Sequence, residues 1–184
     1  MPSRIESVET PDGSFDMAVW LPDNGTGPGL LLIQEIFGVS AYIQAVADDL
    51  AGLGYVVGAP DLFWRLEPGY QAKHDEAGLK RSLEMVSRFD VAQGVTDAEA
   101  ALHRLAALEE VEGGIGAIGF CLGGTIAYFH RKCRAGQSPP GTAKVNAVRA
   151  ASVRATRCDD HPFHGHTSGA GRAPRPFSPA TFGA

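Results

Sequence analysis

The stretch Ile115-Gly-Ala-Ile-Gly-Phe-Cys121-Leu-Gly-Gly-Thr125 joins a short apolar run to the start of a helical pattern. Its centre has the spacing G-x-C-x-G, with Gly119 and Gly123 two residues on either side of Cys121. In a strand-to-helix turn with this spacing the central residue is strained, and the glycines let the strand and helix backbones approach each other. We therefore predict a strand, a tight turn and a helix, with the thiol projecting from the turn.

The position of Cys121 also predicts a nucleophilic thiol. The amino end of a helix carries N–H groups without intrahelical partners and a positive dipole end, and this setting favours a thiolate. The alternative is a small buried cysteine that packs like a hydrophobic residue. The other two cysteines, Cys133 and Cys158, have no spacing that predicts a disulfide framework or a paired-cysteine zinc site. We therefore expect free thiols, no metal and no cofactor.

Apolar runs alternate with helical patterns on the N-terminal side of this turn. Residues 5–21 read as two extended runs around a turn, which predicts an antiparallel hairpin at the edge of a sheet. The short apolar runs at 29–33 and 55–59 predict buried strands. Apolar residues recur with the helical period over 43–53 and 95–108. This order predicts an α/β fold with a mostly parallel sheet and helices on both faces.

The composition changes abruptly after Phe129. Residues 1–129 carry 7 Lys and Arg against 19 Asp and Glu, whereas residues 130–184 carry 9 against 2 and contain no Leu, Ile or Met. Such a tail has too little apolar surface to offset chain entropy, so we expect it to be largely disordered. Our hypothesis is a reading-frame shift near codon 130. The alternative is a basic arm, although scattered charges without interleaved aromatics disfavour nucleic acid as its partner.

The overall composition is that of one globular domain. The chain has 184 residues, a formal net charge of -5 and 44% hydrophobic residues. Its first residues contain no apolar stretch of signal-peptide length, and no window has the roughly 18 to 20 apolar residues that cross a bilayer. We expect a cytoplasmic protein that does not enter a membrane. Nothing in the sequence predicts its oligomeric state.

Three motifs in this order resemble the dienelactone hydrolase family over about residues 5–129. They are Gln34-Glu35-Ile36-Phe37-Gly38-Val39, Ala59-Pro60-Asp61-Leu62-Phe63 and Gly119-Phe-Cys121-Leu-Gly123-Gly124. The resemblance implies the α/β-hydrolase fold, here with its C-terminal part truncated or replaced by the tail. It also implies a carboxylic ester or lactone hydrolase that acts on a small molecule, with Cys121 forming a thioester.

The same resemblance implies roles for the residues around Cys121. Glu35 would accept the thiol proton, which requires that its carboxylate be desolvated. A helix cap or a surface ion pair is the structural alternative for this side chain. The oxyanion hole would use the backbone N–H groups of Ile36 and Leu122. An arginine is expected to bind a substrate carboxylate, and Lys80 and Arg81 are candidates without a clean motif match.

The family's remaining catalytic pair, an aspartate and a late histidine, has no match in context. The tail contains acidic and histidine residues without a preceding buried strand, namely Asp159, Asp160, His164 and His166. Without positioned acid–base groups, release of the thioester should be slow. We therefore expect an impaired hydrolase. The alternative is a non-catalytic fragment or a binding module with a basic C-terminal arm.

Overall fold

The computed structural model describes residues 2–134, with side chains up to residue 128. This part of the chain contains the predicted strands and helices, with three strands at its start and two successive helices before its last strand. In chain order its elements are β1 (Arg4–Thr10), β2 (Gly13–Trp20), β3 (Gly27–Ile33), α1 (Ala41–Gly52), β4 (Val56–Pro60), α2 (Glu76–Arg88), α3 (Val91–Ala106), β5 (Val111–Gly119) and α4 (Leu122–Arg134).

The described strands form one mixed sheet in the order β1-β2-β4-β3-β5. The predicted hairpin is present, with β1 antiparallel to β2 and at the sheet edge. Strand β2 also runs antiparallel to β4, whereas β3 is parallel to both β4 and β5. The predicted parallel pairing therefore holds for the three strands that end in the motifs, and the hairpin adds the antiparallel part.

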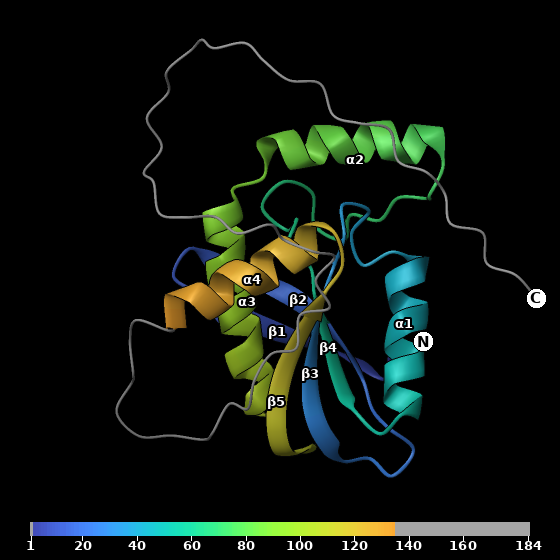
Figure 1. The fold of residues 1–184 in the computed structure, drawn as a ribbon, viewed down its shortest axis with the longest axis vertical. Helices are drawn as coiled ribbons and strands as arrows, with labels where there is room; N and C mark the ends of the chain where they lie inside the picture. The colour runs from blue at the N-terminus through green and yellow to red at the C-terminus, as the bar shows by residue number, and fades with distance from the viewer. Residues whose placement is uncertain (1, 135–184) are drawn as a thin grey trace, which may run out of the picture. The chain divides into compact units, whose positions relative to one another are not determined.

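Helices cover both faces of the sheet, as predicted. Figure 1 shows α1 on one side of the strands and α3 and α4 on the other. The core has a corresponding division, because α1 packs with Trp20 and Leu32 in one apolar cluster, whereas α3 and α4 pack with Met17 and Leu31 in another. Because successive side chains of a strand point to opposite faces, Leu31 and Leu32 fall in different clusters.

The amino ends of two helices are capped by aspartates. Asp75 accepts a hydrogen bond from the Gly78 N–H at the start of α2, and Asp90 accepts from Ala92 and Gln93 at the start of α3. These side chains satisfy N–H groups that the helix itself leaves unpaired. Asp75 thus lies before α2, and Asp90 lies in the short connection between α2 and α3. In Figure 1, α2 lies beyond the carboxyl ends of the strands.

Helix α4 extends past Phe129 to Arg134. The predictions for the rest of the tail fall on residues 135–184, which lie outside the described part of the chain. They include its disorder, Cys158 and the histidines and aspartates considered for a triad. Within residues 2–134, no helix is both long and apolar enough to span a membrane.

Candidate active site

The turn between β5 and α4 has the predicted strained geometry. Cys121 has φ 52°, and among the described residues it is the only one besides glycine with a positive φ. A Cβ on Gly119 would lie 2.2 Å from the Gly123 carbonyl carbon, and one on Gly123 would lie 2.3 Å from the Ile33 carbonyl oxygen. Both glycines are therefore required by close backbone approach. Cys121 is exposed, which does not fit the alternative of a buried packing residue.

The parallel register of β3 and β5 brings two predicted site residues to one edge of the sheet. Ile33 pairs with Gly119, so Glu35 and Cys121 each follow two residues beyond this pair. Neighbouring strands lie about 4.8 Å apart. The Glu35 side chain is only 14% exposed. The structure thus places the candidate base and the candidate nucleophile on adjacent strand ends.

Glu35 has a partner that the sequence did not reveal. Its Oε1 shares a hydrogen bond with His74 Nε2, from the loop between β4 and α2. The His74 ring packs on Phe37 at 4.1 Å between centroids and meets the edge of Tyr42 at 5.8 Å. Tyr42 in turn meets Phe120, the neighbour of Cys121, at 6.1 Å. This aromatic cluster connects the Glu35 side of the site to the cysteine side.

The loop that carries His74 is docked on the Glu35 motif through backbone contacts. The Ala72 N–H donates to the Phe37 carbonyl at 3.0 Å, and Gly38 forms a bridge with Gln71. Gly38 has φ 78°, and a Cβ there would lie 1.9 Å from the Tyr70 carbonyl oxygen. The glycine of the motif is therefore required for a structural reason, because it lets this loop approach Glu35.

The two predicted oxyanion-hole residues lie at the ends of the same strands. Ile36 follows Glu35 in the loop after β3, and its partly buried side chain packs against the core. Leu122 is the first residue of α4, and its side chain is buried in the same cluster. The N–H groups in the first turn of a helix have no intrahelical acceptor. Both side chains are thus anchored in the core at the edge where the cysteine is exposed.

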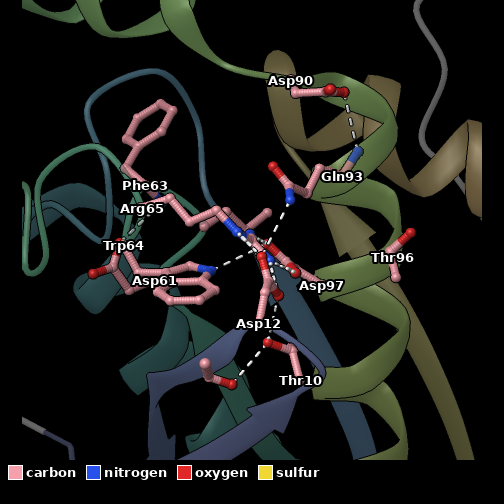
Figure 2. Close-up of polar contacts among 12 residues, drawn as sticks. Thr10, Asp12, Asp61, Phe63, Trp64, Arg65, Asp90, Gln93, Thr96 and Asp97 are labelled. Carbon is pink, nitrogen blue, oxygen red and sulfur yellow. Dashed lines mark hydrogen bonds and ion pairs between the residues drawn. The ribbon is translucent and has the colours of Figure 1, made fainter.

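A polar network anchors the beginning of the same loop, as Figure 2 shows. The Arg65 guanidinium bonds to Asp12 at 2.8 Å and also pairs with Asp97 of α3, which is almost fully buried. The Trp64 indole N–H donates to Asp97 at 3.1 Å. The hydrogen bond from Arg65 lowers the pKa of Asp12 to about 2. The network therefore fixes the loop to the hairpin and to α3.

The chain matches a known protein family over the part that contains this fold and this edge of the sheet. The family model described as "Dienelactone hydrolase family" matches residues 15–137. The chain belongs to the dienelactone hydrolase family. The motifs that carried the resemblance lie at the carboxyl ends of β3, β4 and β5.

Relatives and solved structures of this family match the chain over part of their length. A carboxymethylenebutenolidase from Pseudomonas sp. (strain P51) is 38% identical over 117 residues, which are 63% of this chain and 49% of that protein. The corresponding protein of Pseudomonas putida is 33% identical over 67% of this chain and 53% of its own length. The chain spans about half the length of these curated relatives.

A solved structure supports the same assignment. The dienelactone hydrolase-like promiscuous phosphotriesterase P91 from metagenomic libraries has a TM-score of 0.57 and 27% identity. The match covers 72% of this chain and 54% of that protein. The described strands and helices therefore have the α/β-hydrolase fold of the dienelactone hydrolase family, and the match extends over about half of that protein.

Two polar residues of the dienelactone hydrolase motifs accept hydrogen bonds from the backbone of the loop after β4. The buried Gln34 accepts from the Leu62 N–H at 3.0 Å, which joins the first motif to the second. Asp61 accepts from the N–H groups of Gly69 at 2.6 Å and Phe63 at 3.1 Å. Burial raises the pKa of Asp61 despite these two bonds, which lower it. These motif residues shape the loop after β4.

The two candidates for binding a substrate carboxylate lie on α2. Arg81 forms an ion pair with Glu67 and lies over the Tyr70 ring at 5.3 Å. Lys80 lines an open groove on α2 together with the exposed Leu79 and Leu83. Neither the contacts of Arg81 nor the groove lined by Lys80 includes Glu35 or Cys121.

Proposed function

We propose that this chain is the front part of a carboxylic ester or lactone hydrolase in which Cys121 is the nucleophile. The observation that carries the proposal is an exposed thiol at φ 52° in a turn whose two glycines are required by close backbone approach. Such strain persists only where surrounding structure imposes it, and it is concentrated at functional sites. The names of the relatives point to a butenolide, an unsaturated lactone, as the kind of substrate.

The proposed first step is formation of a thioester. Glu35 takes the proton of the Cys121 thiol, and the sulfur forms a bond to the carbonyl carbon of the ester. The N–H groups of Ile36 and Leu122 stabilise the negative charge on the carbonyl oxygen. The carbon–oxygen bond to the leaving group then breaks, and the leaving oxygen takes the proton held by Glu35.

The second step is attack of water on the thioester, which releases the acid and restores the thiol. We assign no triad aspartate or histidine within residues 2–134. A positioned acid–base group contributes about 10² to 10⁴-fold to such a step. We therefore propose that acylation outpaces release in this chain. The proposed cause is a reading-frame shift after Phe129, which resequencing of the codons around this residue would test.

The test uses p-nitrophenyl acetate as the probe and intact-mass spectrometry as the readout. We expect one acetyl group per chain on Cys121, with release slower than formation. Cys121→Ser should lose the thioester, whereas a variant with Cys133→Ser and Cys158→Ser should retain it. Glu35→Gln should slow acylation by about 10²-fold or more.

Two results would contradict the proposal. One is equal acetylation of all three cysteines, because it would show that Cys121 has no special reactivity. The other is a folded protein without any adduct, judged folded from its circular dichroism. That second result would favour the alternative of a non-catalytic fragment or a binding module with a basic arm.

A further inference from the structure

The sheet formed by residues 2–134 ends in two unlike edge strands. Strand β1 forms one edge and β5 forms the other. The β1 strand places Arg4, Glu6 and Glu9 along its length. Charged side chains are a common protection of a sheet edge against pairing with another chain. Strand β5 has a single charged residue, Glu112, so only the β1 edge has this protection along its whole length.

The sequence of β5 is that of an internal strand. Its apolar residues face both sides of the sheet, because Ile115 packs against the cluster of α3 and α4, whereas Ile118 packs against the cluster of α1. Strands that are apolar on both faces usually lie inside a sheet. Within residues 2–134, however, β5 pairs only with β3, and Ala117 is its only buried residue. An edge strand presents a row of unpaired backbone N–H and C=O groups, which a further strand can use.

We propose that this edge of β5 pairs with β5 of a second copy of the chain, in an antiparallel arrangement about a two-fold axis. The arrangement joins two five-stranded sheets into one continuous sheet. It closes at two copies, because each copy uses the same edge and leaves none for a third. The inference is independent of the proposed function, since it assigns no chemistry to the residues of the candidate active site.

The charge pattern of β5 favours this partner and this direction. Glu112 is the second of nine residues in β5, so antiparallel pairing puts the two Glu112 side chains at opposite ends of the pair. A parallel arrangement would place the two carboxylates side by side, where like charges oppose each other. Apart from Glu112, the strand contains only Gly, Ala, Val and Ile. Strand β5 is therefore complementary to itself in the antiparallel direction.

The C-terminal part of the same chain is a poorer partner for this edge. Residues 130–184 contain no Leu, Ile or Met and carry 9 Lys and Arg against 2 Asp and Glu. Stable strands are rich in β-branched and aromatic residues, which pack against the neighbouring strand. A second β5 supplies Val111, Ile115 and Ile118. We therefore assign the edge to another copy of β5.

Pairing along β5 keeps the two copies of Cys121 apart. Cys121 follows the carboxyl end of β5, and nine residues at about 3.3 Å each make this strand roughly 30 Å long. In an antiparallel pair the two thiols lie at opposite ends, too far apart for a disulfide. The dimer should therefore have the same mass with and without a reducing agent, which distinguishes it from a dimer linked through cysteines.

The experiment measures the mass of the full chain by light scattering after size-exclusion chromatography, under reducing conditions and at several concentrations. We expect monomers at low concentration and dimers, without larger assemblies, at high concentration. Gly114→Lys adds a charge to β5 at a position where a Cβ meets nothing within 4 Å. The dissociation constant should rise about tenfold or more, because each dimer carries the lysine twice. Gly52→Lys, with the same charge change and equally open space on α1, should leave the dimer unchanged.

Hydrogen exchange provides a second measurement that needs no variant. The backbone amides of residues 113–119 should exchange more slowly as the concentration of the original protein rises, whereas those of β1 should not change. A monomer at every concentration would overturn the inference, and so would a dimer that a folded Gly114→Lys variant leaves intact. If the β5 amides of a monomer are protected at every concentration, the same chain covers the edge and the inference is wrong. A dimer lost in Leu83→Lys but kept in Gly114→Lys would instead place the interface on α2, where Leu83 is exposed.

Discussion

Ile33 on β3 pairs with Gly119 on β5 in parallel register. The same two strand ends are also in contact beyond this pair, because Gly123 of α4 packs on the carbonyl oxygens of Ile33 and Gln34. Helix α4, which follows Cys121, thus packs against the end of β3, which leads to Glu35. The relative position of the candidate nucleophile and base therefore depends on backbone packing, which single substitutions can test.

Gly123→Ala should destabilise the protein and distort the turn. Its Cβ would lie 2.3 Å from the Ile33 oxygen and 2.6 Å from the Gln34 oxygen. Relief of such overpacking costs about 1 to 3 kcal/mol, which should appear as a lower urea midpoint. Gly52→Ala in α1 is the matched control, because its Cβ meets nothing within 4 Å. Equal midpoints for the two variants would show that the close approach is not required.

Gly38→Ala should cost more stability than Gly25→Ala. The two glycines have φ 78° and 79°, so they share the conformational cost of about 1 to 2 kcal/mol for a side chain in this region. A Cβ at Gly25 meets nothing within 4 Å, whereas one at Gly38 would lie 1.9 Å from the Tyr70 oxygen. The difference between the two urea midpoints measures the cost of the contact between Gly38 and the loop. Equal midpoints would contradict the prediction.

Cys121→Gly should be more stable than Cys121→Ala, by about 1 kcal/mol. Both variants lack the thiol, but only glycine adopts φ 52° without the steric cost of a Cβ. Thermal unfolding of the two proteins under the same conditions measures the difference. A more stable alanine variant would mean that the turn relaxes out of the left-handed region. It would contradict the interpretation that the backbone at Cys121 is strained.

Asp97→Ala should destabilise the protein on the order of 2 kcal/mol. Asp97 is almost fully buried, and its loss leaves the Trp64 N–H and the Arg65 guanidinium without this acceptor. Asp12→Ala removes the half-exposed partner of the same guanidinium, so a smaller loss is expected. Urea unfolding of both variants provides the test. Similar losses would contradict the idea that burial makes Asp97 the anchor of the loop.

The ion pair between Arg4 and Glu110 should make stability depend on acid pH. The hydrogen bond from Arg4 lowers the pKa of Glu110 from 4.5 to about 2. Because the folded-state pKa is depressed, the stabilisation is fully present above pH 4.5 and is lost as the pH falls from about 4.5 toward 2. The pair lies near the surface, so its contribution should stay below about 1 kcal/mol.

Glu110→Gln measures this contribution. The variant should unfold at a lower urea concentration than the original at neutral pH, and the gap should close over the acid range. Glu109→Gln, at the exposed neighbouring position, should show no gap at any pH. A gap for Glu110→Gln that persists at pH 2 would indicate a cause other than the carboxylate charge.

Local patterns were sufficient to predict most of the described elements. The helical period and the short apolar runs located α1 and β3, and the glycines around Cys121 predicted the turn with φ 52°. These features depend on residues that are neighbours in sequence. The apolar run predicted a strand from Ile115, but β5 already starts at Val111. Between these two residues Gly113 has φ 89°, and the register of β5 with β3 shifts. A glycine in a bulge interrupts a strand pattern without ending the strand.

The sequence alone determined the order of strands and helices, the strained position of Cys121 and the family of the chain. Only the tertiary structure decided that Glu35 pairs with His74, that Gly38 admits the loop at Tyr70, and that Arg65 holds this loop to α3. The reason is physical. Periodicity and turn chemistry act between neighbouring residues, whereas these contacts join segments 32 to 39 residues apart that meet only when the sheet brings its strand ends together.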